Sequence, residues 1–455
     1  MDIEVVILAA GKGTRMRSRR PKVMHTLAGR TLLAHVLEAA VKLGPRAIHV
    51  VVGHQAQQII NSFPSAEVNW IVQDEQLGTG HAVLQALPSV ADDSCVLVLY
   101  GDCPLIRPET LLQMVSLAQT KAALLTADIL DPSGLGRVLR NEHGHIKGVV
   151  EDKDANVDQK LITEINTGVL AAPAAKLKAW LPRVEADNNQ KEYYLLDIIP
   201  FELANGEEVV SAKPDFLWEI EGINDKKQLS QVERAYQLRL ANALMELGVT
   251  LADPFRLDIR GNLNCGNNVF IDINVVIEGE VTLGDDVNIG PNCVIQDSYI
   301  GSGTEIKSHS VLERVTVDGD SDIGPFARLR PGTHLSKGAQ IGNFVETKKA
   351  SIGEGSKVNH LAYIGDSKVG SGANIGAGTI TCNYDGANKH TTKIGDGAFV
   401  GSNSTLVAPV DIEAGAFIGA GSTITKTVPA GQLAIARNRQ RHITRWQKPA
   451  KKPSK

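Results

Sequence analysis

The stretch IEGEVTLGDDVNIGPNCVIQDSYI, residues 277–300, places an aliphatic residue at every sixth position. The same spacing continues on both sides of it, at Ile259, Cys265, Ile271, Ile277, Leu283, Ile289 and Ile295 and again at Ile394, Val400, Leu406, Ile412, Ile418 and Ile424. A six-residue period matches neither the 3.6-residue period of a helix nor the alternation of an ordinary strand. It predicts a solenoid in which each aliphatic side chain points inward and stacks on its equivalents in neighbouring coils.

Glycine follows several of these aliphatic residues, as in Ile289-Gly290, Ile323-Gly324 and Ile418-Gly419. Small residues suit the corners of a coil with short sides, because a glycine corner needs no room for a side chain. The pattern resembles the left-handed parallel β-helix of hexapeptide-repeat proteins, so we expect residues 250–437 to be all-β. Such a solenoid can also be purely architectural, and its fold alone does not establish an activity.

The first half of the chain has a different pattern. Short apolar runs lie at 5–10, 47–52 and 95–100, and a stretch with helical spacing of its apolar residues lies at 32–43. Runs of this kind separated by helices predict a mostly parallel sheet covered on both faces. Residues 1–224 are therefore expected to form an α/β, Rossmann-like domain, with its ligands beyond the carboxyl ends of the strands.

A long helix is predicted between the two halves, over residues 225–249. Its apolar face is marked by Leu229, Val232, Tyr236, Leu240, Leu244 and Leu247. Asn224 or Asp225 can cap its start, and Gly248 suits its end. The predicted organisation is thus a domain at 1–224, a connecting helix at 225–249, a β-helix at 250–437 and a basic tail at 438–455.

The bulk composition excludes several classes of protein. The 455 residues carry a formal net charge of −4, which argues against a general nucleic-acid binder. The five cysteines are odd in number and lack a CxxC pair, which favours reduced thiols in the cytoplasm over disulfides or zinc. The apolar run at 5–10 is too short to span a membrane and lacks the basic flank of a signal peptide. A solvated surface is the simplest interpretation of the basic tail.

A glycine-rich segment follows the first apolar run. It reads Leu8-Ala9-Ala10-Gly11-Lys12-Gly13-Thr14-Arg15 and is followed by Pro21-Lys22. It is not a P-loop, and the third glycine of a dinucleotide fingerprint is replaced by Met16. Glycines alone also fit an ordinary strand-to-helix turn. The two cations favour a phosphate site, because Arg15 and Lys22 can neutralise charge during phosphoryl transfer.

Two more segments of the first half carry chemistry. Residues 73–81, QDEQLGTGH, can offer an amide and close backbone contact to a nucleobase. Asp102 follows the run at 95–100, where an aspartate is often only a turn former. After a phosphate loop it is also a candidate Mg²⁺ ligand, with Asn224 as the second, because Mg²⁺ is held by few protein oxygens together with substrate phosphates.

The β-helix half contains three departures from its repeat. Cations lie near expected corners at Arg330 and Lys348. His360 lies between Val358 and Ile364 rather than at an inward position, and histidine can accept a proton near neutral pH, although an isolated histidine is usually only a surface residue. Residues 381–393 interrupt the period, and inserted loops commonly form binding surface.

Together the LxxGxGTRxxxxxPK segment, the long helix and the hexapeptide repeats resemble, over nearly the whole chain, the bacterial bifunctional family that joins an N-acetylglucosamine-1-phosphate uridyltransferase to a glucosamine-1-phosphate N-acetyltransferase. The resemblance implies synthesis of UDP-N-acetylglucosamine, a precursor of cell-wall material, from acetyl-CoA, glucosamine 1-phosphate and UTP. In the first half it implies that the uridine nucleotide and the sugar are bound by Leu8, Ala9, Ala10, Gly11, Lys22, Gln73, Gly78, Thr79, Tyr100, Gly101, Asp102, Gly136, Glu151, Asn166 and Asn224, with Mg²⁺ on Asp102 and Asn224.

In the second half the resemblance implies that His360 is the general base of acetyl transfer. Glucosamine 1-phosphate would be bound by Arg330, Lys348, Tyr363 and Asn374. Acetyl-CoA would be bound by Ala377, Asn383, Tyr384, Ser402, Ala420 and Arg437. The family also implies a cytoplasmic homotrimer, and neither a nucleic acid nor a membrane is expected as a partner.

Two alternatives remain at this stage. The chain could be a nucleotidyltransferase for another sugar or base whose solenoid only assembles or regulates, or an assembly subunit that has lost its chemistry. Lys22 and Asp102 argue against the assembly subunit, and His360 with the loop at 381–393 argues against an inert solenoid.

Overall fold

The computed structural model describes residues 1–449, so Lys451, Lys452 and Lys455 of the predicted basic tail lie outside the described residues. The chain forms two compact units, Met1–Leu238 and Arg239–Lys455. The long helix α8 (Lys226–Glu246) lies within the range predicted for a connecting helix and spans the boundary between the units. No helix among the described residues is long and apolar enough to cross a membrane.

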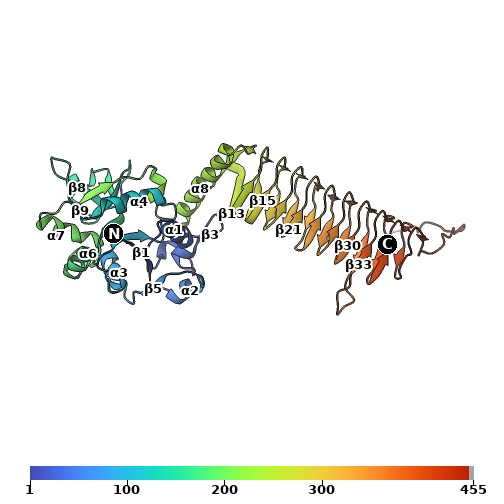
Figure 1. Ribbon diagram of the computed structural model, residues 1–455, viewed down its shortest axis with the longest axis horizontal. Coiled ribbons are helices and arrows are strands. Elements are labelled where there is room, and N and C mark those ends of the chain that lie inside the picture. Colours follow the sequence, from blue (N-terminus) through green and yellow to red (C-terminus); the bar gives the residue numbers. More distant parts are fainter. Residues whose placement is uncertain (450–455) are drawn as a thin grey trace, which may run out of the picture. The chain divides into compact units, whose positions relative to one another are not determined.

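The first unit contains a nine-stranded sheet, shown in blue to green in Figure 1. Its main path runs β11 (Val210–Ala212), β7 (Ala123–Asp128), β10 (Glu164–Pro173), β6 (Cys95–Tyr100), β1 (Ile3–Ala9), β4 (Ala47–Val52) and β5 (Asn69–Val72). β6, β1, β4 and β5 are parallel neighbours, as predicted, whereas β10 is antiparallel to both β6 and β7. The hairpin β8 (Arg137–Arg140) and β9 (Ile146–Val150) joins the sheet through β10.

Apolar side chains of alternate residues on β1 enter separate cores on the two faces of this sheet, because successive strand side chains point to opposite faces. Val5 and Ile7 pack with α1 (Leu32–Val41), α2 (Ala56–Asn61) and α4 (Pro108–Leu117), and Val6 packs with α3 (Thr79–Ala86), α6 (Ala174–Trp180) and α7 (Ile199–Ala204). The unit also contains β2 (Thr26–Leu27), β3 (Arg30–Thr31), α5 (Val157–Lys160) and the 3-10 helices η1 (Thr14–Met16), η2 (Lys22–Met24), η3 (Leu87–Ser89), η4 (Leu181–Arg183), η5 (Leu195–Ile198) and η6 (Leu217–Ile220).

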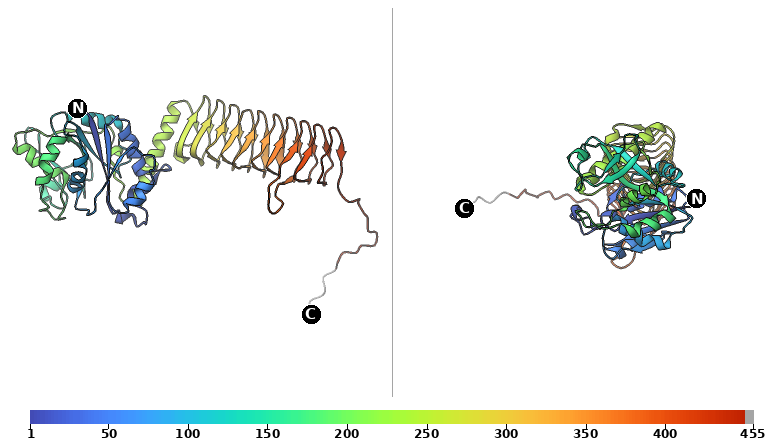
Figure 2. Two further views of the ribbon diagram at one scale, coloured as in Figure 1. Left: turned by 60° about the horizontal axis from the view of Figure 1, so that its bottom comes forward. Right: turned by 90° about the vertical axis from the view of Figure 1, so that its left-hand side faces the viewer.

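The second unit is a parallel β-helix whose successive coils stack side by side in Figures 1 and 2, with η7 (Pro254–Arg256) between its first two strands. One side of the coil is an 11-stranded sheet of β12 (Thr250–Leu251), β14 (Phe270–Ile271), β16 (Asn288–Ile289), β19 (Glu305–Ile306), β22 (Asp322–Ile323), β25 (Gln340–Asn343), β28 (Lys357–His360), β31 (Asn374–Ile375), β34 (Phe399–Val400), β37 (Phe417–Ile418) and β39 (Leu433–Ala434). We call this the first side.

A 17-stranded sheet forms the other two sides. It opens with the long strands β13 (Leu257–Cys265) and β15 (Val275–Leu283). The second side then contains β17 (Val294–Gln296), β20 (Val311–Glu313), β23 (Arg328–Leu329), β26 (Glu346–Lys348), β29 (Tyr363–Gly365), β32 (Ile380–Cys382), β35 (Thr405–Val407) and β38 (Thr423–Ile424). The third side contains β18 (Tyr299–Ile300), β21 (Val315–Val317), β24 (Thr333–Leu335), β27 (Ser351–Ile352), β30 (Ser367–Val369), β33 (Thr392–Ile394) and β36 (Val410–Ile412).

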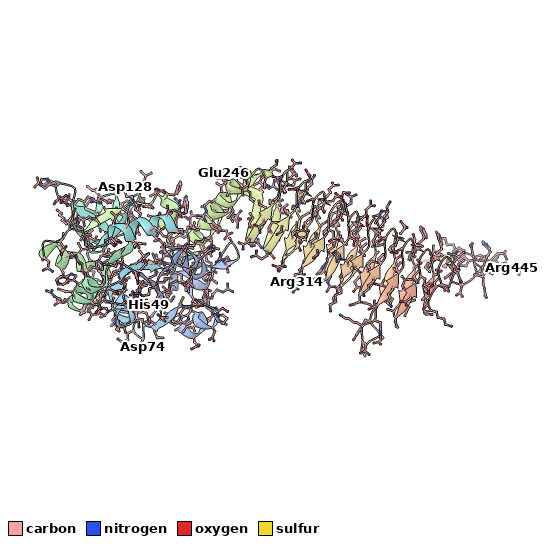
Figure 3. The ribbon with its side chains drawn as sticks, in the orientation of Figure 1. His49, Asp74, Asp128, Glu246, Arg314 and Arg445 are labelled. Carbon is pink, nitrogen blue, oxygen red and sulfur yellow. The ribbon has the colours of Figure 1, made fainter. Side chains whose placement is uncertain are left out.

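The hexapeptide positions predicted to point inward do so. Ile289, Ile306 and Ile323 pair with one another in successive coils of the first side, and all three are fully buried. We call the turn between the first and second sides the first corner, and the turn between the second and third sides the second corner. Arg314, labelled in Figure 3, makes a second corner with a positive φ of 50°. The inserted loop leaves the coil at a second corner, between Cys382 and Thr392.

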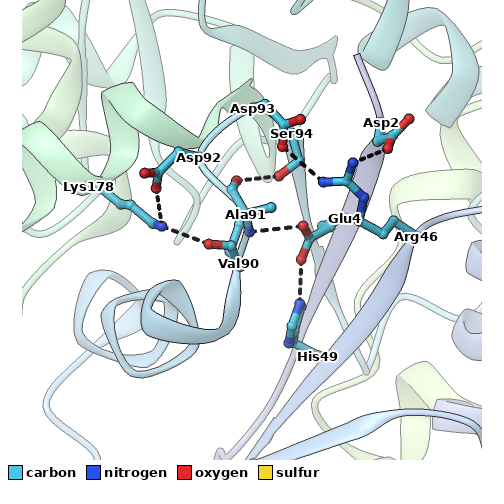
Figure 4. Close-up of polar contacts among 10 residues, drawn as sticks. All are labelled: Asp2, Glu4, Arg46, His49, Val90, Ala91, Asp92, Asp93, Ser94 and Lys178. Carbon is cyan, nitrogen blue, oxygen red and sulfur yellow. Dashed lines mark hydrogen bonds and ion pairs between the residues drawn. The ribbon is translucent and has the colours of Figure 1, made fainter.

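A buried polar pair ties β1 to β4 in the first unit (Figure 4). Glu4 is 2% exposed and His49 is fully buried, and His49 Nε2 lies 2.8 Å from Glu4 Oε2. The other carboxylate oxygen of Glu4 accepts a hydrogen bond from the backbone N–H of Ala91 at 3.0 Å. Burial alone would raise the pKa of Glu4, but the hydrogen bonds from His49 and Ala91 outweigh it, and the pKa lies below its ordinary value of 4.5.

We predict that Glu4→Gln destabilises the first unit by about 1–3 kcal/mol at pH 7, because the buried groups around it lose a charged partner. The lowered pKa means that the ionised Glu4 stabilises the fold above pH 4.5, and that this contribution is lost as the pH falls through the folded-state pKa. Urea unfolding from pH 7 down to pH 3 should therefore show a shallower loss of stability in the variant. Glu142→Gln, at an exposed position, is the matched control, and equal pH dependence of the wild type and Glu4→Gln would contradict the prediction.

Candidate functional site

The carboxyl ends of β1 and β6 bring two predicted segments together. Leu8 is the partner of Tyr100 in the parallel pairing, and the N–H of Gly101 donates a hydrogen bond to the carbonyl of Leu8 at 3.0 Å. The segment 8–11 and the segment 100–102 therefore lie side by side at one edge of the sheet, where ligands of parallel sheets bind.

Lys22 lies between the two predicted metal ligands. Its ammonium forms an ion pair with Asp102 and donates a hydrogen bond to Asn224 Oδ1 at 3.1 Å. The backbone fixes the two oxygen-bearing residues next to each other, because the N–H of Ile223 donates to the carbonyl of Asp102 at 2.9 Å. Gly13 allows Lys22 this position, since a β-carbon on Gly13 would lie 2.7 Å from Lys22 Cβ.

The donor set at this point fits Mg²⁺. The carboxylate of Asp102 and the amide oxygen of Asn224 both face one cation, the Lys22 ammonium, so the two oxygens can converge on a single positive charge. Oxygen ligands and few protein groups are typical of Mg²⁺ sites that are completed by substrate phosphates. No cluster of three or more His, Cys, Asp or Glu side chains suited to a metal occurs in the described part of the chain.

The predicted nucleobase segment, residues 73–81, packs closely against residues 193–195. The side chain of Gln73 is buried and its Nε2 lies 2.9 Å from His81 Nδ1. Gly78 has a φ of +114°, and a β-carbon there would lie 2.6 Å from the carbonyl oxygen of Tyr193, so only glycine fits. The hydroxyl of Thr79 accepts a hydrogen bond from the N–H of Leu195 at 3.1 Å.

The three predicted sugar-binding residues also come together. The N–H of Asn166 donates to the carbonyl of Gly136 at 2.9 Å, and the β-carbon position of Gly136 lies 3.0 Å from a carboxylate oxygen of Glu151. Tyr100 links this group to the phosphate end, because its ring packs on Gly168, where a β-carbon would lie 2.5 Å from the ring.

Glu151 lines a cavity of about 230 Å³. Of the residues that line this cavity, only Glu151 was predicted from the sequence. Burial, together with nearby carboxylates, raises the pKa of Glu151. Burial and the charge of Asp154 raise the pKa of Asp197 to about 6. Tyr194 and Asp197 line the cavity and were not predicted as site residues. Their only sequence signal is an aromatic pair, Tyr193-Tyr194, before an apolar run, which also fits an ordinary core segment.

Arg15, the second predicted phosphate-binding cation, is exposed in η1, next to the glycine segment. Lys22 is thus held by Asp102 and Asn224, whereas Arg15 faces solvent.

In the second unit, His360 ends β28 at a first corner. Its Nδ1 lies 3.0 Å from Asn343 Oδ1 in the neighbouring coil. An amide oxygen can only accept, so this contact suits the tautomer with its proton on Nδ1, in which the Nε2 lone pair can accept a proton. Asn343 was not predicted as a site residue, since only the three-dimensional pairing of β25 with β28 places it beside His360.

Three of the predicted acetyl-CoA residues, Ala377, Ser402 and Ala420, lie in the same column of the β-helix as His360. Val358, Ile375, Val400 and Ile418 pair in successive coils, and the residues two positions later are His360, Ala377, Ser402 and Ala420. Backbone hydrogen bonds continue this column, from Asn403 N–H to Ala377 O at 2.7 Å and from Gly421 N–H to Ser402 O at 2.8 Å. Arg437 ends it, with its guanidinium donating to the carbonyl of Ala420.

Three cations gather at a second corner. Lys348 ends β26, and Arg330 follows β23 in the preceding coil. The nearby charge of Lys389, and then that of Arg330, lowers the pKa of Lys348. Lys389 was not predicted, because its place beside Lys348 depends on the path of the inserted loop. Such a cluster of like charges is suited to a phosphate, which would relieve the repulsion.

The inserted loop is held in shape by its own polar contacts. Asp385 lies 2.7 Å from His390 and accepts hydrogen bonds from two backbone N–H groups of the loop, and these contacts lower the pKa of Asp385. Asn383 donates to Asp366, and the hydroxyl of Tyr384 donates to the carbonyl of Gly386 at 2.6 Å. Asn383 and Tyr384 thus start from a second corner, whereas the column of Ala377, Ser402 and Ala420 follows the first corner.

Tyr363 and Asn374 complete the predicted sugar-phosphate set. Tyr363 begins β29 on the second side, just after His360 at the first corner. Gly365, which ends β29, pairs with Lys348 near the second corner. Asn374 pairs with Lys357, in the coil next to His360. Tyr363 therefore lies on the second side of the coil with Lys348, whereas Asn374 begins β31 on the first side.

Family models match both halves of the chain. Residues 5–139 match the MobA-like NTP transferase domain. Residues 264–297 and 391–426 match the bacterial transferase hexapeptide model of six repeats.

Close relatives match nearly the full length. Proteins named "Bifunctional protein GlmU" from Marinobacter nauticus and from Alkalilimnicola ehrlichii are 54% identical over 450 residues and 53% identical over 453 residues. The matches cover 99% of this chain and 99% of the first relative, and 100% of this chain and 98% of the second. A solved nucleotidyl transferase from Methanothermobacter thermautotroptrophicus is 21% identical with a TM-score of 0.40, over 52% of this chain and 99% of that one.

We predict that Lys389→Met weakens binding of glucosamine 1-phosphate to the second unit by about tenfold, since one charge-assisted contact to the phosphate is lost. Titration calorimetry of the full chain measures this directly. Lys426→Met removes an exposed lysine elsewhere on the β-helix and is the matched control. Unchanged affinity in Lys389→Met would show that the inserted loop does not complete the anion site.

Proposed function

The chain belongs to the GlmU family of bifunctional proteins, and we propose that its first unit carries the uridylyltransferase site and its second unit the acetyltransferase site. The protein is a bifunctional transferase of UDP-N-acetylglucosamine synthesis. It transfers the acetyl group of acetyl-CoA to glucosamine 1-phosphate, and then the uridylyl group of UTP to N-acetylglucosamine 1-phosphate, releasing pyrophosphate. One observation above all supports the division between units: His360 shares one column of the β-helix with Ala377, Ser402 and Ala420.

Uridylyl transfer needs alignment and charge neutralisation rather than a covalent intermediate. A phosphate oxygen of N-acetylglucosamine 1-phosphate attacks the α-phosphorus of UTP, the bond to the bridging oxygen of the β-phosphate breaks, and pyrophosphate leaves. The backbone of residues 8–11, which lies beside residues 100–102, would contact the nucleotide. Arg15 and Lys22 would offset the negative charge that grows on the phosphates during the transfer. Asp102 and Asn224 would hold Mg²⁺, which supplies further positive charge to the phosphates.

The nucleotide and sugar are bound on either side of these cations. The amide of Gln73 and the close-fitting backbone at Gly78 and Thr79 suit the uracil base. Glu151 and Asn166, together with the backbone at Gly136, suit the hydroxyl groups of the sugar. Tyr100 and Gly101 form the floor between the two.

Acetyl transfer is general-base catalysis. The amine nitrogen of glucosamine 1-phosphate attacks the thioester carbonyl of acetyl-CoA and its proton passes to His360 Nε2. The carbon–sulfur bond breaks, and CoA leaves as a thiolate that takes up a proton to give the thiol. Arg330, Lys348 and Lys389 hold the phosphate of the sugar, with Tyr363 and Asn374 beside it. The extended CoA chain follows the column of Ala377, Ser402 and Ala420, and Arg437 suits a CoA phosphate.

Three finer points rest on the family. We infer a homotrimer in the cytoplasm, without nucleic-acid or membrane partners. The placement of Asn383 and Tyr384 at another corner from the acetyl-CoA column supports a site that neighbouring chains complete. The tail beyond Arg437 is basic, which suits a phosphate-rich ligand but assigns no role to single residues.

Paired substitutions test the division of labour. Asp102→Ala is expected to reduce uridylyl transfer by at least about 100-fold and to leave acetyl transfer intact, because only the first unit loses a charged group. His360→Ala should reduce acetyl transfer by about 10²–10⁴-fold and leave uridylyl transfer intact. Pyrophosphate release and CoA thiol release measure the two activities on the same preparation. A variant that loses both activities equally would contradict two separate sites.

Asn343 is expected to act as a positioning residue through His360. Asn343→Ala removes the acceptor that keeps the proton on Nδ1, so kcat of acetyl transfer should fall by about tenfold with little change in KM, a fraction of the 10²–10⁴-fold that a positioned base contributes. Asn343→Asp keeps an acceptor and should retain most of the rate. Initial rates of thiol release decide the matter, and equal losses in the two variants would indicate a merely structural role.

A further inference from the structure

The loop after β1 carries an unusual concentration of positive charge. Residues 12–20 contain five cations and no carboxylate, namely Lys12, Arg15, Arg17, Arg19 and Arg20. All five are exposed, and within residues 1–449 none of them forms an ion pair with a carboxylate. Only Arg15 belongs to the motif that indicated a phosphate site. The other arginines are therefore unexplained by the contacts described so far.

Both ends of this loop are anchored at the uridylyltransferase site. It starts from Gly11 at the end of β1 and returns at Lys22, which contacts Asp102 and Asn224. Met16 is 1% exposed and pins the middle of the loop to the fold. Arg20 is two residues from Lys22, so its Cα lies within about 7.6 Å of that of Lys22 by chain length alone. The arginines thus lie on a loop whose two ends are at the proposed phosphate site.

A further cation, Lys226 at the start of α8, lies near enough to act with Arg20 on His25. Burial and then the charges of Arg20 and Lys226 lower the pKa of His25, which favours its neutral imidazole. The sugar end of the same site has the opposite character, because Glu151, Asp154 and Asp197 line its cavity. A field of this polarity would draw a polyphosphate toward one end of the site and away from the other.

We propose that Arg17, Arg19 and Arg20 form a capture surface for polyphosphate anions, which steers the triphosphate of UTP onto Arg15 and Lys22 in the forward reaction and pyrophosphate in the reverse reaction. The inference rests on the uridylyltransferase activity proposed for this unit. Exposed charges of this kind act over a screening length of about 8 Å at physiological ionic strength, so they accelerate encounter more than they strengthen a bound complex.

The test is the triple variant Arg17→Gln/Arg19→Gln/Arg20→Gln in the full-length protein. At low ionic strength its kcat/KM for UTP should fall roughly tenfold below that of the wild type, at the lower end of the effects that electrostatic steering produces. The difference should disappear near 0.5 M salt, because screening removes steering, while kcat at saturating UTP stays the same. The reverse reaction, assayed with UDP-N-acetylglucosamine and pyrophosphate, should lose kcat/KM for pyrophosphate in the same salt-dependent manner.

Two controls separate steering from structural damage. Lys147→Gln/Lys160→Gln/Lys426→Gln makes the same change in net charge at exposed lysines elsewhere and should leave kcat/KM unchanged. Arg17→Lys/Arg19→Lys/Arg20→Lys keeps the charge and should behave as the wild type, and acetyl transfer reports that each variant is folded.

A triple glutamine variant with unchanged kcat/KM in both directions, or with a deficit that persists at 0.5 M salt, would overturn the proposal. A loss for UTP alone would overturn the pyrophosphate part of it. If the wild type itself showed no uridylyl transfer, the proposed function would be overturned. The assay of the wild type therefore distinguishes failure of the proposed function from failure of the capture surface.

Discussion

The parallel register of the β-helix is the constraint on which the second unit depends. An aliphatic residue at every sixth position must point inward in every coil, and this fixes which residues are neighbours between coils. The residue two positions after each buried first-side residue then lies at a first corner, outside the core. Asn343, His360, Ala377, Ser402 and Ala420 are such residues. The same packing that stabilises the solenoid therefore lines up the proposed base with the proposed acetyl-CoA contacts.

An analogous constraint operates in the first unit. Parallel pairing of β1 with β6 brings residues 8–11 against residues 100–102, and the hydrogen bond from Ile223 brings Asn224 to Asp102. Lys22 occupies the point where these segments converge. Residues 8–11 and 100–102 lie at the carboxyl ends of strands in the first sheet, and the first-corner residues end or follow strands of the β-helix, whereas Lys22 lies in η2.

Patterns with a strict period or a motif were predictable from the sequence. The six-residue period gave the inward positions of the β-helix, and the glycine and proline-lysine motif singled out Lys22, which contacts Asp102 and Asn224. Contacts that depend on the fold were not predictable. Asn343 meets His360 only through strand pairing, and Lys389 meets Lys348 only through the path of the inserted loop. Asp197 reaches the cavity at Glu151 only because η5 packs beside α3. The antiparallel β10 was also missed, since an apolar strand has the same composition in either direction.

The central claim is that one chain carries two complementary chemistries in series. The most direct measurement supplies purified protein with glucosamine 1-phosphate, acetyl-CoA and UTP, and follows CoA thiol and pyrophosphate together. We expect thiol to appear first and pyrophosphate to follow, until equal amounts of both have formed, and we expect no pyrophosphate when acetyl-CoA is omitted. Pyrophosphate formation from glucosamine 1-phosphate without thiol release would show that the two activities are not coupled in this order.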